Sequence, residues 1–555
     1  MHLYRTAVAA AVLLAAPLAW TPGAQSQAPA IESIRQADLR ADLFFLASDA
    51  LAGRLTNTRE NRIAAEWIKA RFERLGLAPG VPGYFQEFDL ATVSLGPTNA
   101  MTVTRSGSTP QSVAHGEGFT AQRFSPTASG SGPVVFAGYG ISAPDLGHDD
   151  YRDRDRIRGA VVLVLDHEPG ERDAANRFDG VVTSDAGGAL RKAQAAQAAG
   201  AAAILFVSDV HNHGSATAGR GARGGRGGRG GAGAWGGAPS RLGRYTLSDW
   251  MRSLRIPAAQ ITAELAADLA SGTGLSFEDL ARTADTPGGT PPAPLPGVEV
   301  DLTISVDRQD IPDRNVLAVL EGSDARLRDE WIVLSAHYDH DGATDQVVYN
   351  GADDDGSGTV GVLELAEAFA DAAAAGRRPR RSILFAQFNS EERGLLGAWA
   401  YTLHPIAPLE RTIAVLNMDM IGRNEEVPAE GGNRFNGLEP QTAESNGNAL
   451  NVLGSVRAPG LRAAIDRANR GLGLDIRYRY DNNVSQLMRR SDQWPFIQNG
   501  VPGVWIFTGL HPDYHTGNDT PDRINYEKME RILKLVYQVT WDLAEADGRP
   551  SLLGR

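Results

Sequence analysis

Apolar residues between positions 31 and 86 recur at helical intervals. In the stretch NRIAAEWIKARFERLGLAPG, Ile63, Trp67, Ile68, Phe72 and Leu75 fall on one helical face. A glycine and a proline follow this run, as is typical where a helix ends. The pattern therefore predicts an amphipathic helix near the start of the chain.

The pattern changes to short apolar runs between about residues 110 and 290. GPVVFAGYG, GAVVLVLD and AAAILFVSD read as strands, and GGALRKAQAAQAAG as a helix. This region, residues 110–294, is predicted to be an inserted small β-rich domain. Within it, residues 214–243 are so rich in glycine and arginine that we expect a flexible loop. Arg-Gly repeats also occur in proteins that bind single-stranded nucleic acid, but loop expansion is the favoured interpretation.

Continuous apolar strands alternate with amphipathic helices in residues 295–548. The strands are EWIVLSAHYDH, RSILFAQFNSEE, RTIAVLNMDMIG and GVPGVWIFTG. Such alternation predicts an α/β fold with a mostly parallel central sheet flanked by helices. Residues 29–109 are expected to be the N-terminal part of the same domain.

The first 28 residues resemble a secretory signal peptide. Arg5 precedes an apolar stretch at residues 7–20, and small residues follow it. The alternative is a membrane anchor, but the stretch is short for a span. The sequence predicts a secreted or periplasmic protein without stable membrane insertion after cleavage.

Charge and cysteine content narrow the function classes. The formal net charge of −13 argues against nucleic acid as a partner, because phosphate binding needs a basic surface. The chain has no cysteine, which excludes disulfides, thiolate metal sites and a cysteine nucleophile.

Side chains suited to metal binding follow four of the predicted strands. They are His337 and Asp339, Glu391 and Glu392, Asp419, and His515. In an open α/β sheet, sites gather at the carboxyl ends of the strands. Each residue alone is more often a cap, a turn or a surface residue, but the joint pattern predicts one site.

Three consecutive aspartates, Asp353 to Asp355, lie between the first two of these strands in YNGADDDGSGTV. They could form a solvated turn, a helix cap or a cation site. Imidazole and carboxylate donors without thiolate suit zinc, cobalt or manganese. Two histidines and three carboxylates suffice for two metal ions that share one carboxylate. In the Glu391–Glu392 pair, one carboxylate can bind metal while the other accepts a proton.

At these residues the chain resembles the M28 family of di-zinc aminopeptidases. SAHYDH, YNGADDDGSG, NSEERGLLGA, NMDMIG and PDYHTGND carry the resemblance. It implies five metal ligands for two Zn²⁺ ions: His337, Asp353, Glu392, Asp419 and His515. It further implies that Asp353 bridges the ions, that Glu391 is the general base and that Asp339 orients His337. Asp354 would shape the turn, and Asp355 would favour the following helix.

The inserted region more loosely resembles a protease-associated (PA) domain, through FAGYGISAPDLGHDDY, RGAVVLVLD and AQAAGAAAILFVSD. Such a domain would restrict the cleft or contact other proteins. The chain departs from the family at Met488, where some members carry a tyrosine that stabilises the oxyanion, and at Gln493. Arg489, Arg490 or a nearby tyrosine would have to substitute.

Three further histidines give weaker signals of metal binding. His211 and His213 look like a metal pair but have no carboxylate cluster beside them in sequence. His340 is expected to alternate to the side opposite His337, and so to lie behind the ligands or on the surface. The resulting hypothesis is an exported zinc aminopeptidase acting on peptides. The alternatives are a carboxypeptidase or dipeptidase, an inactive binding relative, and a glutaminyl cyclase.

Overall fold

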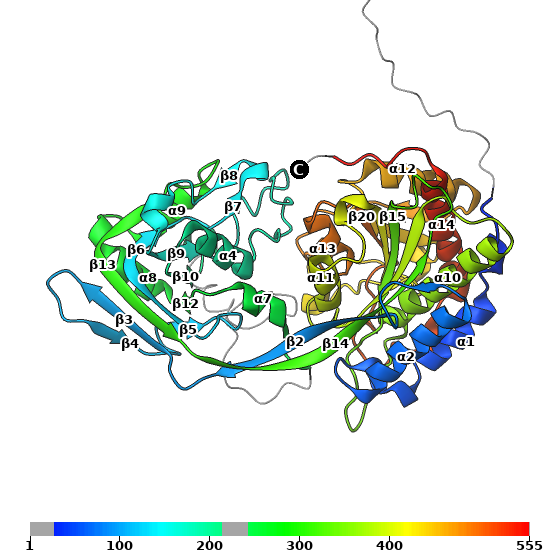
Figure 1. Ribbon diagram of the computed structural model, residues 1–555, viewed down its shortest axis with the longest axis horizontal. Helices are drawn as coiled ribbons and strands as arrows, with labels where there is room; N and C mark the ends of the chain where they lie inside the picture. The colour runs from blue at the N-terminus through cyan, green and yellow to red at the C-terminus, as the bar shows by residue number, and fades with distance from the viewer. Residues whose placement is uncertain (1–26, 214–241, 554–555) are drawn as a thin grey trace, which may run out of the picture.

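The computed structural model describes residues 27–213 and 242–553, which form two lobes (Figure 1). The main lobe is built on one sheet and the inserted lobe on another. The predicted signal peptide, apart from its last two residues, lies outside the described residues, and so does most of the predicted glycine-rich loop. From its first described residues the chain packs on the main lobe, since Ala28 is buried and its N–H donates to Gln538.

The sheet of the main lobe has, in the described residues, the strand order β11-β2-β14-β16-β15-β17-β20-β18-β19, with β1 beside β14. The bounds are β1 Ala78–Pro79, β2 Phe85–Leu95, β11 Thr246–Leu247, β14 Val306–Leu320, β15 Trp331–His337, β16 Ser382–Phe388, β17 Thr412–Met418, β18 Ala449–Leu453, β19 Asp475–Arg477 and β20 Gly503–Phe507.

The four central strands of this sheet, β16, β15, β17 and β20, are parallel. On either side the pairing turns antiparallel, between β14 and β16 and between β18 and β20. The sheet is therefore mixed, with a parallel centre, where the sequence predicted a mostly parallel sheet. The parallel centre is the part that positions the candidate site.

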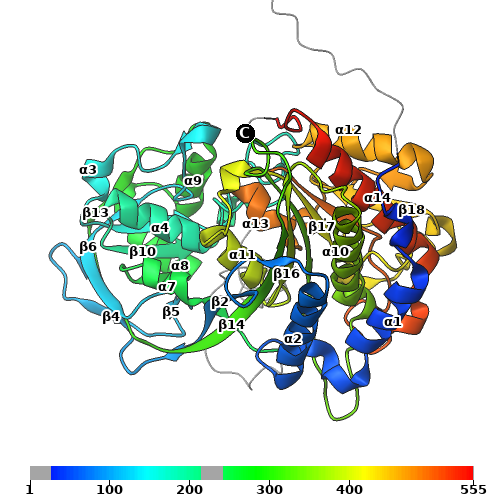
Figure 2. The same cartoon turned by 45° about the vertical axis from the view of Figure 1, so that its right-hand side comes forward.

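Helices cover both faces of the main sheet (Figure 2). Ile332 and Leu334 of β15 pack in the core under α1, α2, α10 and α14, whereas Val333 points to the opposite core with α11 and α13. This alternation follows from the two-residue period of a strand. The bounds are α1 Gln36–Leu46, α2 Arg59–Arg74, α10 Gly358–Ala374, α11 Leu396–Leu403, α12 Pro459–Ala468, α13 Gln493–Gln498 and α14 Tyr526–Glu545.

The inserted lobe contains a second sheet of order β4-β3-β13-β6-β9-β10-β12-β5. The strand bounds are β3 Ala100–Arg105, β4 Gln111–Val113, β5 Phe119–Ala121, β6 Ala128–Phe136, β9 Val161–Leu165, β10 Ala203–Val207, β12 Ala258–Ile261 and β13 Ala293–Ile304, with the small pair β7 Ser142–Ala143 and β8 His148–Asp149. Its helices are α3 Arg154–Ile157, α4 Ala189–Ala199, α5 Val210–His213, α7 Ser248–Ser253, α8 Ala263–Ala270 and α9 Phe277–Arg282. This sheet extends beyond the predicted 110–294 at both ends.

Two kinds of contact join the lobes. The long antiparallel strands β2 and β14 run from one lobe to the other (Figure 1). In addition, the loop of residues 174–185, which we call the docking loop, bonds to the main lobe. Val181 N–H donates to Asn482 Oδ1 at 2.8 Å, and Thr183 N–H donates to Gln486 Oε1 at 2.8 Å.

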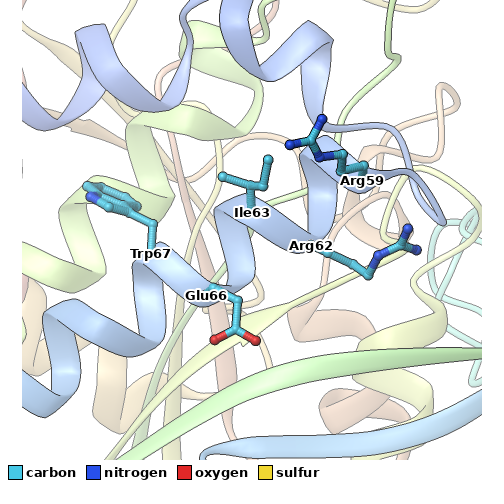
Figure 3. Close-up of a pocket in the computed structure, with 5 residues that line it drawn as sticks. All are labelled: Arg59, Arg62, Ile63, Glu66 and Trp67. Carbon is cyan, nitrogen blue, oxygen red and sulfur yellow. The ribbon is translucent and has the colours of Figure 1, made fainter.

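The predicted amphipathic helix corresponds to α2, whose N-terminus is capped by the Thr58 side chain. Ile68 and Phe72 are buried as predicted, but Ile63 is 38% exposed. Together with Trp67, Arg59, Arg62 and Glu66, it lines a surface hollow of about 410 Å³ (Figure 3). All five lining residues belong to α2, so this hollow contains none of the predicted site residues.

Among the described helices, none is long and apolar enough to cross a membrane.

Candidate metal centre

The predicted site residues meet at one edge of the main sheet. His337 is the last residue of β15, Asp419 follows β17, and Glu391 and Glu392 come shortly after β16. Because these strands are parallel neighbours, their carboxyl ends share one edge. His515 reaches the same edge from the segment after β20.

One half of the cluster surrounds His337, which is 1% exposed. Its Nε2 atom lies 3.3 Å from Asp354 Oδ1 and 3.8 Å from Asp419 Oδ2. Glu391 Oε2 lies 3.7 Å from the same nitrogen. Two carboxylates and an imidazole thus face one point, with a third carboxylate beside them.

The other half of the cluster surrounds His515. Its Nε2 atom lies 3.1 Å from Asp354 Oδ2 and 3.5 Å from Glu392 Oε2. Asp354 therefore presents one carboxylate oxygen to each half. His340 belongs to this half as well, since its Nδ1 atom lies 2.9 Å from Glu392 Oε1.

The structure does not bring Asp353, the predicted bridging ligand, between the two histidines. Asp353 Oδ1 accepts hydrogen bonds from Gly422 N–H at 2.6 Å and Ser357 Oγ at 3.1 Å. Its other oxygen lies 3.3 Å from Nε2 of the buried His511. The sequence-based assignment of the bridge is off by one residue in this geometry, because three identical neighbours give no local signal of which one turns toward the strand ends.

Asp355 acts as a backbone anchor. Its carboxylate accepts hydrogen bonds from the N–H groups of His337 at 3.0 Å, Gly358 at 2.9 Å and Met420 at 3.2 Å. It thereby joins β15, the start of α10 and the end of β17. The peptide bond between Asp354 and Asp355 is cis.

Two further carboxylates support the histidines from behind. Asp339 Oδ1 lies 3.6 Å from His337 Nδ1 and accepts the N–H of Glu391 at 3.0 Å. Asp341 Oδ2 lies 2.7 Å from His515 Nδ1, and Asp341 Oδ1 accepts from Arg393 at 2.8 Å. Sequence reasoning found Asp339 but missed Asp341, because β15 ends at His337 and the partner of Asp341 is His515, which is distant in sequence.

A sharp turn presents the glutamate pair. Ser390 adopts a left-handed conformation with φ of 58°, and its hydroxyl donates to Asp313 Oδ2 at 2.6 Å. Such a conformation is uncommon for a residue with a side chain and needs support from its surroundings. Here it redirects the chain immediately after β16, so that both Glu391 and Glu392 reach the cluster.

Burial and mutual charge set the ionisation of the cluster. Burial raises the pKa of Asp419 to about 7 and that of Glu391 well above its usual value. Burial alone would lower the pKa of His337, but Glu391 and the neighbouring aspartates outweigh it and raise that pKa well above its usual value. Without a cation, the negative form of these carboxyl groups is therefore disfavoured.

The donor atoms fit divalent cations. His337 Nε2 and Asp354 Oδ2 are buried, and they face only other members of the cluster, without a further hydrogen-bond partner among the described residues. Buried polar atoms in proteins are nearly always satisfied, so two such donors aimed into an acidic cluster indicate a ligand. Imidazole and carboxylate groups are the donors that zinc prefers in the absence of thiolate.

The side chains considered for the oxyanion position make hydrogen bonds or packing contacts of their own. Met488 is buried, and its carbonyl accepts from Gln493. Arg490 donates to the carbonyl of Ser485. Tyr514, in contrast, lies beside the cluster, with its ring centroid 4.0 Å from that of His515.

The other three histidines named from the sequence, His340, His211 and His213, have surroundings that the sequence did not predict. His340 does not point away but joins the second half of the cluster. His211 pairs with Asp285 at 3.5 Å, whereas His213 meets a carboxylate of another loop.

A comparison with known protein families matches the part of the chain that holds the strand-end residues. Residues 315–540 match peptidase family M28. This segment holds all seven predicted site residues, as well as Asp354 and Asp341. The segment belongs to peptidase family M28.

Individual relatives are more distant. A probable zinc metalloprotease of Leptosphaeria maculans is 28% identical over 269 residues, covering 42% of this chain and 58% of the relative. A probable glutamate carboxypeptidase of Arabidopsis thaliana is 30% identical over 213 residues, covering 38% of this chain and 26% of the relative. The chain thus spans little more than half of one relative and about a quarter of the other. Among solved structures, an aminopeptidase from Aneurinibacillus sp. strain AM-1 has a TM-score of 0.45 at 17% identity, covering 95% of this chain and 97% of that one.

Proposed function

We propose that the chain is a zinc-dependent exopeptidase that removes N-terminal residues from peptides. The observation that carries the proposal is the placement of Asp354, whose two oxygens face His337 and His515 from within a buried cluster. Membership of the segment in peptidase family M28 supports the reaction class, and the zinc metalloprotease relative supports the metal.

Two ions have a complete set of protein donors. His337, Asp419 and one oxygen of Asp354 would hold the first, and His515, Glu392 and the other oxygen of Asp354 the second. When bound, two zinc ions supply a Lewis acid for the scissile carbonyl and lower the pKa of the attacking water.

The remaining residues handle the proton and hold the ligands in place. Glu391 is proposed to accept the proton of the attacking water and to deliver it to the leaving amine, because its carboxylate faces the cluster without being needed as a ligand. Asp339 and Asp341 would orient His337 and His515 from behind, as carboxylates commonly do for metal-binding imidazoles.

Replacement of Glu391 tests this assignment. Glu391→Gln keeps the shape of the side chain but removes the base, so turnover should fall by about 10²–10⁴-fold while zinc content stays unchanged. Glu364→Gln is the matched control, because Glu364 is also a buried glutamate but contacts Arg35 instead of the cluster. Full turnover in Glu391→Gln would remove this residue from the role.

The direction of cleavage needs a separate test, because the Arabidopsis relative is named a carboxypeptidase. An aminopeptidase should cleave C-blocked peptides and reject N-blocked ones, and a carboxypeptidase or dipeptidase should show a different pattern. Absence of both zinc and peptidase activity would favour an inactive binding relative. Cyclisation of N-terminal glutamine without hydrolysis would favour a glutaminyl cyclase.

We further propose that the chain is exported by means of its N-terminal signal-like segment and that the inserted lobe is a PA-like domain that limits access to the site. The charged and apolar order of the N-terminal residues supports export. The bonds of the docking loop to Asn482 and Gln486 support a contact of the inserted lobe with the lobe that holds the site.

A further inference from the structure

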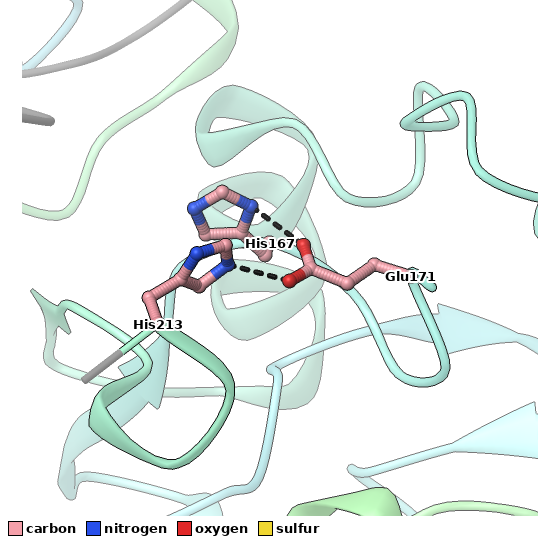
Figure 4. A group of neighbouring side chains, drawn as sticks. All are labelled: His167, Glu171 and His213. Atoms are coloured by element: carbon pink, nitrogen blue, oxygen red, sulfur yellow. Dashed lines mark ion pairs between the residues drawn. The ribbon is translucent and has the colours of Figure 1, made fainter. Parts of the chain in front are cut away.

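A second cluster of metal-type donors lies in the inserted lobe, apart from the residues of the candidate metal centre. It consists of His167, Glu171 and His213, which we call the insert cluster (Figure 4). Strands β9 and β10 are parallel neighbours with Leu165 opposite Val207. His167 comes two residues after the end of β9, and His213 ends α5, the short helix after β10. The carboxyl ends of two adjacent strands thus bring the histidines together.

The two histidines address different oxygens of one carboxylate. His167 Nδ1 lies 2.8 Å from Glu171 Oε2, and His213 Nε2 lies 2.5 Å from Glu171 Oε1. One donor atom from each of the three residues lies within 4.8 Å of the others. Their side chains are 14% to 39% exposed, so the cluster is partly enclosed yet accessible from solvent.

The surroundings of His167 hold its ring in place. The residue has a left-handed φ of 61°, which is unusual for a histidine and directs its side chain toward Glu171. Its carbonyl accepts from the buried Lys192, and Asp166 Oδ2 lies 3.9 Å from Nε2 on the far side of the ring. A carboxylate behind a metal-binding imidazole is a common arrangement.

An ion-pair arrangement without metal is the simpler alternative. In it each ring, neutral or protonated, donates one N–H to Glu171, and that single carboxylate holds two rings whose centroids are 4.2 Å apart. A divalent cation would be bound by both rings in their neutral form. Two imidazoles and one carboxylate form a donor set that suits zinc and related transition metals and leaves room for water as a fourth ligand.

We infer that His167, Glu171 and His213 bind one divalent transition-metal ion of the zinc type. The ion would join the start of the loop after β9 to α5. The same loop continues into the docking loop, where Thr183 and Asp185 bond to Gln486 and Gln498 of the main lobe. The insert cluster is therefore a structural site that fixes the loop through which the inserted lobe contacts the main lobe.

Zinc stoichiometry of the full-length protein tests the inference. The chelated protein is equilibrated with a fixed free Zn²⁺ concentration, and bound zinc is measured by mass spectrometry after gel filtration. His167→Asn and His213→Gln should each bind one zinc fewer per chain than the unchanged protein. His211→Gln is the matched control, because His211 lies on the same short helix but pairs with Asp285.

The same variants are then made in a chain that also carries Asp419→Asn. The loss of one zinc per chain should remain there, which would show that it does not come from the candidate metal centre. Zinc-edge anomalous diffraction should show a peak among the three side chains that disappears in Glu171→Gln. Circular dichroism identifies any variant that fails to fold. If one of the two histidine variants, His167→Asn or His213→Gln, is lost in this way, the zinc content of the other tests the inference. Equal zinc content in His167→Asn, His213→Gln and His211→Gln, or no anomalous peak, would overturn the inference.

Discussion

The three consecutive aspartates occupy three different environments, and a matched pair of substitutions separates two of them. Asp354→Asn removes negative charge from the oxygens that face His337 and His515, so zinc affinity and turnover should fall by at least about a hundred-fold. Asp353→Asn keeps an acceptor for Gly422, so it should lower thermal stability slightly and leave zinc content unchanged. The measurements are zinc content and kcat/KM. If Asp353→Asn lost zinc and Asp354→Asn kept it, Asp353 would be the bridging ligand, as the sequence predicted.

Some features of the candidate site could be predicted from the sequence, and others could not. The ligand types and their positions after the strands could be predicted, because parallel strands end at a common edge. The choice among Asp353, Asp354 and Asp355 could not, because it depends on which backbone groups each carboxylate meets. His340 was placed on the wrong side because the alternation of β15 ends at His337, after which the chain leaves the strand.

At the scale of elements, one buried arginine holds the segments that carry the cluster. Arg54 is fully buried, and its guanidinium donates to the carbonyls of Leu46, Tyr338, Asn350 and Gly351. Burial lowers its pKa to about 10, while the nearby aspartates act in the opposite direction. Arg54 thus links the end of α1 to two loops. One follows β15, and the other leads into the three consecutive aspartates. Its sequence context, ALAGRLT, gave no signal of this role.

Removal of this arginine should be costly. Arg54→Met leaves four buried carbonyls without their donor and the nearby carboxylates without a counter-charge, so the free energy of unfolding should fall by about 3 kcal/mol or more. Arg62→Met, at an exposed position of α2, should change it by less than about 0.5 kcal/mol. Urea denaturation measures both. Equal stability of the two variants would contradict the role of Arg54.

Metal-type side chains gather at strand ends in both sheets of this chain. For the main sheet the sequence predicts this, whereas for the second sheet it shows only the apolar runs of β9 and β10. His213 has His211 as its neighbour in sequence, but its partners His167 and Glu171 come from the loop after the adjacent strand. The missing information was the pairing of β9 with β10, which is a tertiary contact.

At the scale of the whole molecule, the changing periodicity predicts a separate region at residues 110–294, but it does not predict the extent of each sheet. Strands β2 and β14 extend through both regions, and β11 returns from the inserted segment to pair with β2. These pairings make the main sheet mixed. They join segments far apart in sequence, so local patterns do not reveal them.

The metal-free molecule should lose stability as pH rises. Burial raises the pKa of Asp419, Glu168 and Glu364 to about 7, and that of Asp313 to about 6. In the unfolded chain these groups titrate near pH 4. Between pH 4 and 7 the folded protein thus holds protons that the unfolded chain releases, and the free energy of unfolding must fall with rising pH. Zinc acts oppositely, because its ligands bind it only when deprotonated.

Calorimetry of chelated and zinc-loaded protein from pH 5 to pH 8 checks this expectation. The Tm of the chelated protein should fall across this range, and the rise in Tm caused by zinc should grow. Asp419→Asn removes one of the groups that titrate near 7, so the chelated variant should show a shallower fall than the unchanged chain. A chelated Tm that stays flat or rises with pH would show that the buried carboxylates of both lobes are ionised in the folded protein, and that the metal is not needed to offset their charge.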